Sequence, residues 1–272
     1  MRSFFFILLL FPVLQGVSQE TNRAYDRLGI LAGWQQTRLV DQQFSPLMYK
    51  ANELSFKLYY NAKHHQSNWN VSLEAATGSL FPPQFADRML YNTTEDIDGN
   101  MTTDSFFVRG NTRSANLQIG YAYDLVQTNH WAVSAGGSVR NQLMYPSTFV
   151  NLGIMNAASF LITAEGTYYA NSENQLSAGI SMPVMGFNSR FPYSGTVSTP
   201  NQTLLEAFFD GGTRFVSLGK YTQVNANLTW RYSLSDKTGI GLQYDFMWQR
   251  YTTPVILKQY SFRIGISIDF TL

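Results

Sequence analysis

Hydrophobic and polar residues alternate one by one over the last stretch of the chain, Gln259 to Leu272. Every second position is apolar, namely Tyr260, Phe262, Ile264, Ile266, Ile268, Phe270 and Leu272. The positions between them are small, polar or charged. A period of two predicts a β-strand with one apolar and one polar face. A soluble edge strand of this kind would promote aggregation. A membrane barrel would instead cover the apolar face with lipid and the free edge with its first strand.

The same alternation recurs along the chain and predicts ten strands. They are expected at about residues 27–39, 53–62, 69–76, 114–125, 131–145, 159–168, 175–184, 223–232, 240–248 and 259–272. Pro183 falls late in the seventh strand, which predicts a bulge or an end of strand pairing there. The fold class that follows is all-β, a transmembrane antiparallel up-and-down β-barrel of about ten strands.

The connections between the predicted strands alternate in length. Short turns are expected near residues 65, 128, 173 and 237, and longer loops near residues 45, 95, 152, 205 and 255. Outer-membrane barrels have short periplasmic turns, longer outside loops and an even number of strands. We therefore expect both termini in the periplasm and the long loops outside the cell.

The tryptophans favour a barrel over the alternative, a soluble β-sandwich. In each predicted strand the tryptophan falls on the same alternate positions as the apolar residues: Trp34, Trp69, Trp131, Trp230 and Trp248. Most of them lie near the predicted strand ends, as an interfacial aromatic belt requires. A sandwich would not place every tryptophan on the same face as the longest apolar rows.

The first residues have the pattern of a secretory signal peptide. Arg2 precedes an apolar run from Phe4 to Leu14, and Gly16 and Ser18 are the small residues of a cleavage site. We expect residues 1–18 to be removed and residues 19–272 to form a single barrel domain. The apolar run is too short to cross about 30 Å of hydrocarbon as a helix, which disfavours a membrane anchor.

Composition narrows the possible functions further. The chain has no cysteine, which excludes disulfides, thiolate metal sites and cysteine nucleophiles. Its formal net charge of +1 gives no reason to expect a nucleic-acid partner. Aromatic residues make up 15% and charged residues 14% of the chain, a balance that suits a barrel with a belt in lipid. We expect no cofactor.

The closing segment carries a family resemblance. Its alternating aromatic and aliphatic residues, ending in Phe270 and Leu272, resemble the C-terminal strand of bacterial outer-membrane β-barrels, of a Gram-negative and Bacteroidota type. The resemblance implies residence in the outer membrane and contact with its lipid and lipopolysaccharide. It also implies recognition of this strand by the barrel-assembly machinery.

Two classes of outer-membrane enzyme have histidine-containing catalytic sites that bear on this chain. The stretch His65-Gln66-Ser67-Asn68 is similar to the motif of outer-membrane phospholipase A and lipid A deacylases, in which His is the general base and Ser the nucleophile. Omptin proteases, which are also ten-stranded, use a His–Asp couple at the outer rim. All three histidines here, His64, His65 and His130, fall in predicted periplasmic turns. We therefore expect a polar turn and no enzymatic activity.

The loop near residue 95 contains an acidic cluster that resembles a calcium site. The candidate oxygen ligands are Asp96, Asp98, Asn100 and Asp104. An EF-hand needs Gly at its sixth and Glu at its twelfth position, where this loop has Gly99 fourth and Phe107 twelfth. A solvated acidic loop is the favoured interpretation, so we expect no metal. Near residue 205, Thr203 to Phe209 followed by Gly211 predicts a short helix that caps the barrel mouth or meets a ligand or partner.

Six charged residues have the inward parity at mid-strand depth: Lys57, Glu74, Arg140, Glu165, Asp245 and Arg263. Facing lipid would cost about 2–4 kcal/mol for each Lys or Arg at the midplane, so they are expected in the lumen. Opposed residues of an antiparallel hairpin have a constant sum of numbers. This predicts the pairs Lys57–Glu74, Arg140–Glu165 and Asp245–Arg263.

The sequence leaves three functions open. The first is a non-enzymatic outer-membrane barrel with a structural or surface-interaction role, whose long loops meet an extracellular or envelope protein. The second is a narrow channel for small or hydrophobic solutes, since a lumen of this strand number is too small for a wide pore. The third and least favoured is an outer-leaflet lipid hydrolase.

Overall fold

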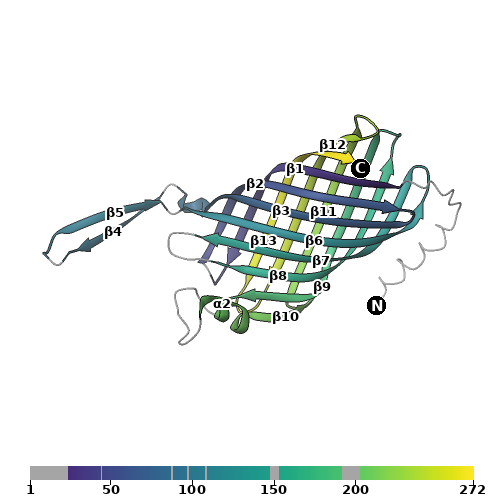
Figure 1. Ribbon diagram of the computed structural model, residues 1–272. Helices are drawn as coiled ribbons and strands as arrows, with labels where there is room; N and C mark the ends of the chain where they lie inside the picture. The colour runs from purple at the N-terminus through teal and green to yellow at the C-terminus, as the bar shows by residue number, and fades with distance from the viewer. Residues whose placement is uncertain are drawn as a thin grey trace, which may run out of the picture.

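Alternating apolar residues build ten long strands that close into a barrel in the computed structural model (Figure 1). The structure describes residues 24–43, 45–86, 88–96, 98–107, 109–147, 153–191 and 203–272, so the expected signal peptide lies outside the described residues. The barrel strands are β1 (Tyr25–Asp41), β2 (Ser45–His64), β3 (Ser67–Phe81), β6 (Gly110–Gln127), β7 (Trp131–Ser147), β8 (Met155–Tyr169), β9 (Asn174–Arg190), β11 (Tyr221–Ser233), β12 (Thr238–Tyr251) and β13 (Leu257–Thr271).

Every barrel strand pairs antiparallel with its neighbours, and β13 closes the ring by pairing with β1. That closing seam runs from Arg27 opposite Thr271 to Asp41 opposite Leu257. The expected all-β barrel of about ten strands is confirmed. Closure leaves no free strand edge in the barrel wall. The backbone N–H and C=O groups of the strands can therefore all be hydrogen-bonded within lipid.

The outer wall of the barrel is apolar. Leu54, Phe56 and Leu58 of β2 are 61%, 56% and 47% exposed, and the outward positions of the other barrel strands follow the same pattern. All five tryptophans lie on this wall; Trp248 is half-buried and the other four are exposed. Such an apolar exterior on a closed barrel is that of a transmembrane barrel of the bacterial outer-membrane type. Among the described residues, no helix is both long and apolar enough to cross a membrane.

The two ends of the barrel differ. One end, here called the turn end, has short connections at residues 65–66, 128–130, 170–173 and 234–237 and carries Leu272. The other, the loop end, carries the segments at 82–109 and 191–220. Its first connection is short as well: β2 begins at Ser45, so only residues 42–44 join it to β1. The prediction of a longer loop near residue 45 is therefore wrong, because β2 begins well before the residues that alternate clearly in the sequence.

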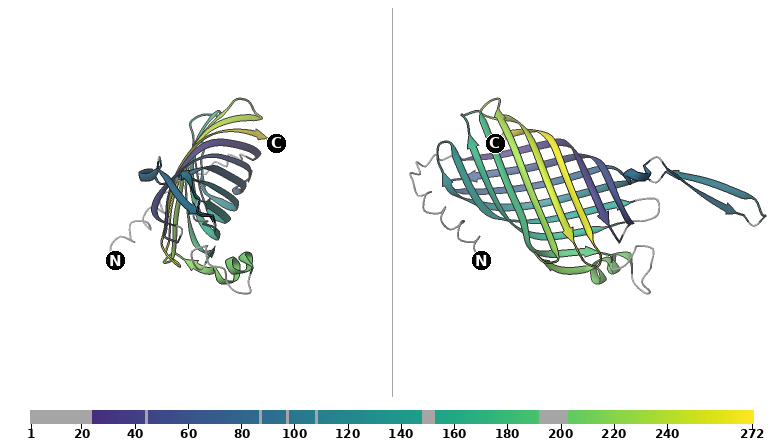
Figure 2. Two further views of the ribbon diagram at one scale, coloured as in Figure 1. Left: turned by 90° about the vertical axis from the view of Figure 1, so that its left-hand side faces the viewer. Right: turned by 180° about the vertical axis from the view of Figure 1, so that it is seen from behind.

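The segment expected as a long polar loop at residues 81–112 contains a hairpin. A short 3₁₀ turn, η2 (Pro83–Phe85), leads to β4 (Met89–Glu95), which pairs with β5 (Met101–Phe107). The pair projects away from the barrel as a thin ribbon (Figure 2). Threonines and aromatic residues give both strands β propensity, and Asp98-Gly99 is a hairpin-turn signal within the sequence.

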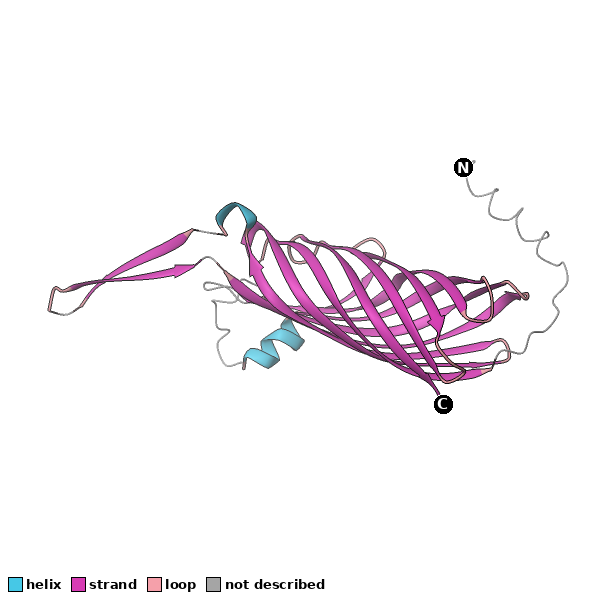
Figure 3. Cartoon of the chain, turned by 90° about the horizontal axis from the view of Figure 1, so that it is seen from above, coloured by secondary structure: helices cyan, strands magenta, loops and turns pink. Residues whose placement is uncertain are grey.

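The second long segment also contains structure. A single turn of α-helix, α2 (Leu204–Glu206), continues as a π-turn, η3 (Ala207–Gly211), and then β10 (Thr213–Ser217) begins. β10 pairs with the loop end of β9, with Thr213 opposite Ser189, and β11 takes over farther along, with Asn225 opposite Ser181. The helix lies at the same end of the barrel as the hairpin, opposite the C-terminus (Figure 3).

Pro183 of β9 sits at an irregularity, as expected. The β8–β9 register shifts between Phe160 and Leu161, whose partners are Met185 and Pro183. Val184 is therefore the extra residue of a bulge, and β9 continues beyond it to Arg190. The bulge accommodates a residue that has no N–H to donate to the ladder.

Candidate functional site in the barrel lumen

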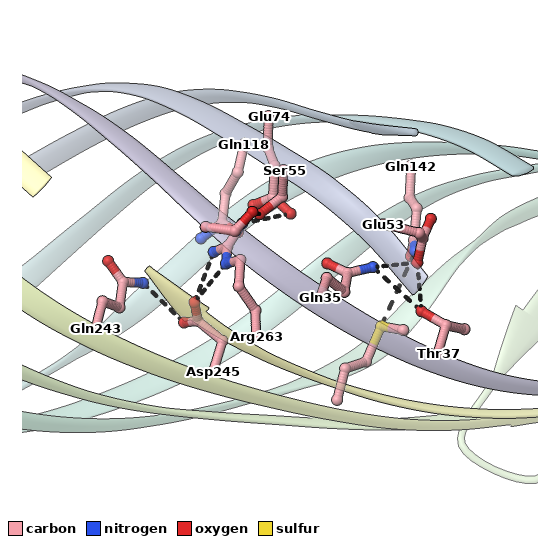
Figure 4. A network of polar contacts seen from close by, with 12 residues as sticks. Gln35, Thr37, Glu53, Ser55, Glu74, Gln118, Gln142, Gln243, Asp245 and Arg263 are labelled. Carbon is pink, nitrogen blue, oxygen red and sulfur yellow. Dashed lines mark hydrogen bonds and ion pairs between the residues drawn. The ribbon is translucent and has the colours of Figure 1, made fainter. Parts of the chain in front are cut away.

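The inward positions of the strands form a charged layer halfway along the lumen. Arg263 of β13 lies at its centre and is almost fully buried. Its Nη1 lies 2.7 Å from Glu74 Oε1 of β3, and its Nη2 lies 2.6 Å from Asp245 Oδ2 of β12. Figure 4 shows both carboxylates directed at the one guanidinium, with Gln243 donating to Asp245 at 2.7 Å. One arginine thus joins two walls of the barrel across the lumen.

The strand register in the structure places two of the three predicted charge pairs opposite each other. Lys57 is the Cα partner of Glu74, and Asp245 is the partner of Arg263. The ion pairs, however, do not all follow the Cα register, because Glu74 forms its ion pair with Arg263 and not with Lys57. Among the described residues Lys57 has no ion pair, and its ammonium lies 5.9 Å from the centroid of the Tyr59 ring.

The predicted pair Arg140–Glu165 is wrong. Arg140 stands opposite Ser159, and Glu165 stands opposite Ser134. The two charges are six residues out of register, about 20 Å along the strands at roughly 3.3 Å a residue. The prediction placed the hairpin axis at the middle of an assumed loop, whereas β8 already begins at Met155, opposite Met144, which moves that axis toward lower numbers.

Arg140 is held by neutral amides. Its Nε and Nη2 donate to Gln118 Oε1 at 3.0 and 2.7 Å, and its Nη1 donates to Asn225 Oδ1 at 3.0 Å. These partners fix the guanidinium across the lumen between β6 and β11. Glu165, by contrast, accepts only a long 3.5 Å bond from Thr167 among the described side chains.

The charged layer divides the lumen into two chambers. The chamber toward the turn end has a volume of about 330 Å³, and the chamber toward the loop end about 150 Å³. Five residues line both chambers and so form the constriction between them: Lys57, Ser72, Gln118, Arg140 and Asp245. Further ion pairs occur in the larger chamber, where Lys63 Nζ lies 2.6 Å from Asp124 Oδ2 and Arg231 Nη2 lies 2.6 Å from Asp269 Oδ1.

Apolar side chains fill the lumen at the loop end. We call this cluster the plug; it consists of Leu39, Met144, Met155, Ala157, Val216, Tyr221, Tyr251 and Leu257, all buried. Leu39 and Met144 also line the smaller chamber, so the plug forms its roof. These residues come from β1, β7, β8 and β10–β13, so the plug fills the lumen from the sides that these strands form, while β2, β3 and β6 contribute no residue to it.

A buried ion pair crosses the mouth above the plug. Arg190, at the end of β9, pairs through Nη2 with Asp41 Oδ1 at the end of β1. Its Nη1 donates to the Val255 carbonyl at 3.1 Å, and its guanidinium lies 5.7 Å from the Tyr251 ring centroid. The bridge connects strands on distant parts of the wall, which stiffens the closed mouth.

Neither the plug nor this bridge was predicted from the sequence. The signal for the plug was present: Leu39, Tyr221, Tyr251 and Leu257 are apolar residues at inward parity near strand ends. In the sequence they look like breaks in the alternation, because apolar residues stand where polar ones are expected. Their common location becomes clear only when the strands surround one lumen. Asp41 and Arg190 are far apart in sequence, and only barrel closure brings them together.

The expected short helix is present and begins with a reciprocal cap. The Glu206 backbone N–H donates to Thr203 Oγ1 at 3.3 Å, and the Thr203 N–H donates to Glu206 Oε2 at 2.7 Å. The Thr203 N–H and the Thr203 Oγ1 hydroxyl both donate to the Glu206 carboxylate, and these two hydrogen bonds lower the pKa of Glu206. Phe208 is buried and packs edge-on against Phe191 at the end of β9, with the ring centroids 5.3 Å apart. The helix is thereby fixed beside the mouth.

The candidate lipase motif lies in the tightest turn of the barrel. His65 has a positive φ of 54° in the two-residue turn between β2 and β3, and Ser67 Oγ lies 3.1 Å from the Tyr121 hydroxyl. His64 lies next to this turn and His130 in another, so all three histidines are at the turn end. His65 and Ser67 therefore lie in the surroundings of an ordinary hairpin turn between β2 and β3.

The acidic loop uses its carboxylate to form a turn. Asp96 Oδ1 accepts hydrogen bonds from the backbone N–H groups of Asp98 and Asn100, both at 2.8 Å. These hydrogen bonds, those from Asn100 first, lower the pKa of Asp96. Asp104 lies farther along β5, opposite Asn92. The described residues contain no group of three or more candidate metal ligands.

The predicted assembly strand is β13, and its apolar residues face outward. Tyr260, Ile264, Ile266, Ile268, Phe270 and Leu272 are exposed on the outer wall, and Phe262 is half-buried beside Trp34. Its Leu272 N–H donates to the Asp26 carbonyl at 2.9 Å, which extends the seam with the first strand to the end of the chain.

Comparisons with known proteins add a general likeness to other barrels. No family model and no curated protein matches the chain. Among solved structures, the outer membrane protease OmpT of Escherichia coli aligns with 8% identity and a TM-score of 0.49, over 95% of this chain and 100% of that chain. The translocator domain of the autotransporter NalP of Neisseria meningitidis aligns with 10% identity and a TM-score of 0.37, over 97% and 95%.

Ail of Yersinia pestis aligns with 11% identity and a TM-score of 0.31, over 90% of this chain and 99% of that chain. These scores and identities carry no functional argument. The comparisons also give no support to the Bacteroidota-type origin expected from the sequence.

Proposed function

We propose that this protein is a non-enzymatic outer-membrane barrel that presents the β4–β5 hairpin for recognition by an extracellular or envelope protein. The observation that carries the proposal is a contrast at the loop end. There the lumen is filled by the plug and crossed by the Arg190–Asp41 pair, while the hairpin extends well clear of the barrel (Figure 1). The proposal places the loop end outside the cell and both termini in the periplasm.

The hairpin has the properties of a recognition element. Met89, Tyr91, Met101 and Phe107 lie on one face and are 37%, 70%, 68% and 54% exposed. Threonine pairs on both faces hold the strands together, with Oγ1 atoms 3.0 Å apart in Thr93–Thr103 and in Thr94–Thr102. An isolated two-stranded hairpin is marginally stable in water, so a partner that covers the apolar face or adds a strand to an edge stabilises it.

Site-specific crosslinking on intact cells tests the proposal. A photo-crosslinking residue at Tyr91, on the apolar face, is expected to capture one protein reproducibly. The same residue at Thr94, on the opposite face, is the matched control and is expected to capture much less. Replacement of Met89–Phe107 by a Gly-Ser linker should leave the barrel inserted and abolish binding of the captured protein. Equal capture from both faces, or unchanged binding without the hairpin, would contradict the proposal.

The second candidate is a narrow conduit in a closed state. The observation that favours it is the pair of chambers in the lumen, of about 330 and 150 Å³, joined at a charged constriction. On this hypothesis the plug is a gate, and small solutes pass only when it moves. Planar-bilayer conductance of the refolded barrel separates the two candidates. Spontaneous opening steps support the conduit, and a silent barrel supports the recognition role.

A further inference from the structure

Four cations gather on the outer wall at the loop end of four adjacent strands. We call Arg38 of β1, Lys50 of β2, Arg250 of β12 and Lys258 of β13 the rim cations. All four have the parity of the apolar outer face; Lys50 is half-buried and the other three are exposed. Their strands follow one another in the sheet in the order β12, β13, β1 and β2.

The register places like charges directly opposite each other. Arg38 is the Cα partner of Lys50, and Arg250 is the Cα partner of Lys258. Lys258 is also the partner of Val40, two residues from Arg38 on the same face. Like charges at directly opposed positions destabilise a sheet. The two pairs form one continuous basic patch, which repels itself unless an anion binds.

No acidic side chain within the described wall offsets this patch. The outward neighbours on the same half of the four strands include Gln36, Val40, Met48 and Asn52, together with aromatic residues. None of the rim cations has an ion pair with a described residue. Inside the barrel, by contrast, four cations have a carboxylate partner, namely Lys63, Arg190, Arg231 and Arg263, although Lys57 and Arg140 have none among the described residues.

A row of aromatic residues lies next to the rim cations, closer to the middle of the barrel wall. Tyr260 is two residues from Lys258 on the same face, and Trp248 is two residues from Arg250. Arg38 lies 5.7 Å from the Tyr260 ring centroid, and farther in Trp34 packs edge-on against Phe262 at 5.6 Å. Aromatic side chains mark the headgroup level of a membrane barrel. The rim cations therefore lie at the depth of the lipid headgroups.

We infer that the rim cations form a binding site for the phosphorylated headgroup of a lipid in the surrounding leaflet. Arginine and lysine are the residues suited to phosphate, and the apolar wall beneath them accommodates the acyl chains. With the loop end outside, as in the proposed function, that lipid is the phosphorylated glycolipid of the outer leaflet, lipopolysaccharide. The phosphates would neutralise the like-charge pairs that the chain itself leaves unbalanced.

Thermal unfolding of the purified full barrel in neutral detergent tests the inference. Bis-phosphorylated lipid A is added in mixed micelles, and its stabilising effect is followed by tryptophan fluorescence. The variant in which Arg38, Lys50, Arg250 and Lys258 are all replaced by Gln should bind on the order of tenfold more weakly or worse. The variant Arg113→Gln is the matched control. Arg113 is an exposed outward cation at the same end, opposite Thr77 and Tyr145, and its loss should change little.

A measurement without lipid shows whether the fourfold variant folds. In neutral detergent alone it should unfold at the same or a higher temperature than the unchanged protein, because the repulsion is gone. Dephosphorylated lipid A should not stabilise the unchanged protein, and inorganic phosphate at the same phosphate concentration should not replace the lipid. Undiminished binding by the fourfold variant, equal binding of dephosphorylated lipid, or full replacement by inorganic phosphate would overturn the inference.

The test is independent of the proposed function. The titration uses purified protein, so its result does not depend on which way the barrel faces in the cell. The orientation is tested separately with tags on intact cells. A tag at Asp98 should be accessible to antibody, and a tag at Lys237 should not. Reversed accessibility would overturn the proposed orientation and leave the lipid-binding result standing.

Discussion

Arg263 is the residue on which the charged layer of the lumen depends. It neutralises Glu74 and Asp245 together, while those carboxylates are 21% and 24% exposed to the lumen. Arg263→Met would leave two carboxylates facing each other. We expect a loss of about 1–3 kcal/mol in the free energy of unfolding. This is less than the ~3–5 kcal/mol of a fully buried pair, because the lumen hydrates both carboxylates in part. Urea unfolding in detergent micelles measures it.

Two further variants identify the cause of that loss. Adding Glu74→Gln and Asp245→Asn to Arg263→Met should restore most of the stability, because no unpaired charge then remains. Lys57→Met is the matched control, since Lys57 lines the same constriction without an ion pair among the described residues. If Lys57→Met is as damaging as Arg263→Met, the ion pairs of Arg263 are not the source of the effect.

At the scale of the element, β13 closes the barrel and carries the proposed assembly signal. Deletion of residues 270–272 removes the pairing of Phe270 with Leu28 and of Thr271 with Arg27, together with the hydrogen bond from Leu272. We expect a large drop in the folded fraction found in outer membranes, measured by heat-modifiable gel mobility. The conservative variant Phe270→Leu keeps the apolar alternation and should insert normally. Normal insertion of the shortened chain would refute the role given to this strand.

At the scale of the whole molecule, two barriers in series close the lumen: the plug at the loop end and the charged constriction halfway along. Replacing Leu39, Met144 and Leu257 by Ala opens only the first. We expect the unchanged barrel to be silent in planar bilayers and this variant to show small conductance steps, limited by the constriction. Leu31→Ala is the control, because Leu31 is a fully buried inward leucine of β1 outside the plug. Large steps from the unchanged protein would show that the plug does not seal the lumen.

The sequence by itself determined the wall of the barrel. Period-two alternation fixed which residues face lipid and which face the lumen, since neighbouring side chains of a strand point to opposite sides. It also fixed the Lys57–Glu74 register, because the turn at His65 and Gln66 is too short to allow a shift. The β4–β5 hairpin was within reach of the same reasoning through Asp98-Gly99, but its threonine-rich strands lack a continuous apolar row.

Only the tertiary structure decided what fills the lumen. The connection after β7 is too long to fix a register, so Arg140 and Glu165 could not be placed from sequence numbers alone. Arg263 reaches Glu74 across the barrel, and Arg190 reaches Asp41 across its mouth. Such contacts depend on closure of the sheet, which brings together side chains from strands that are distant in the chain. Alternation says that a residue points inward, and closure decides what it meets there.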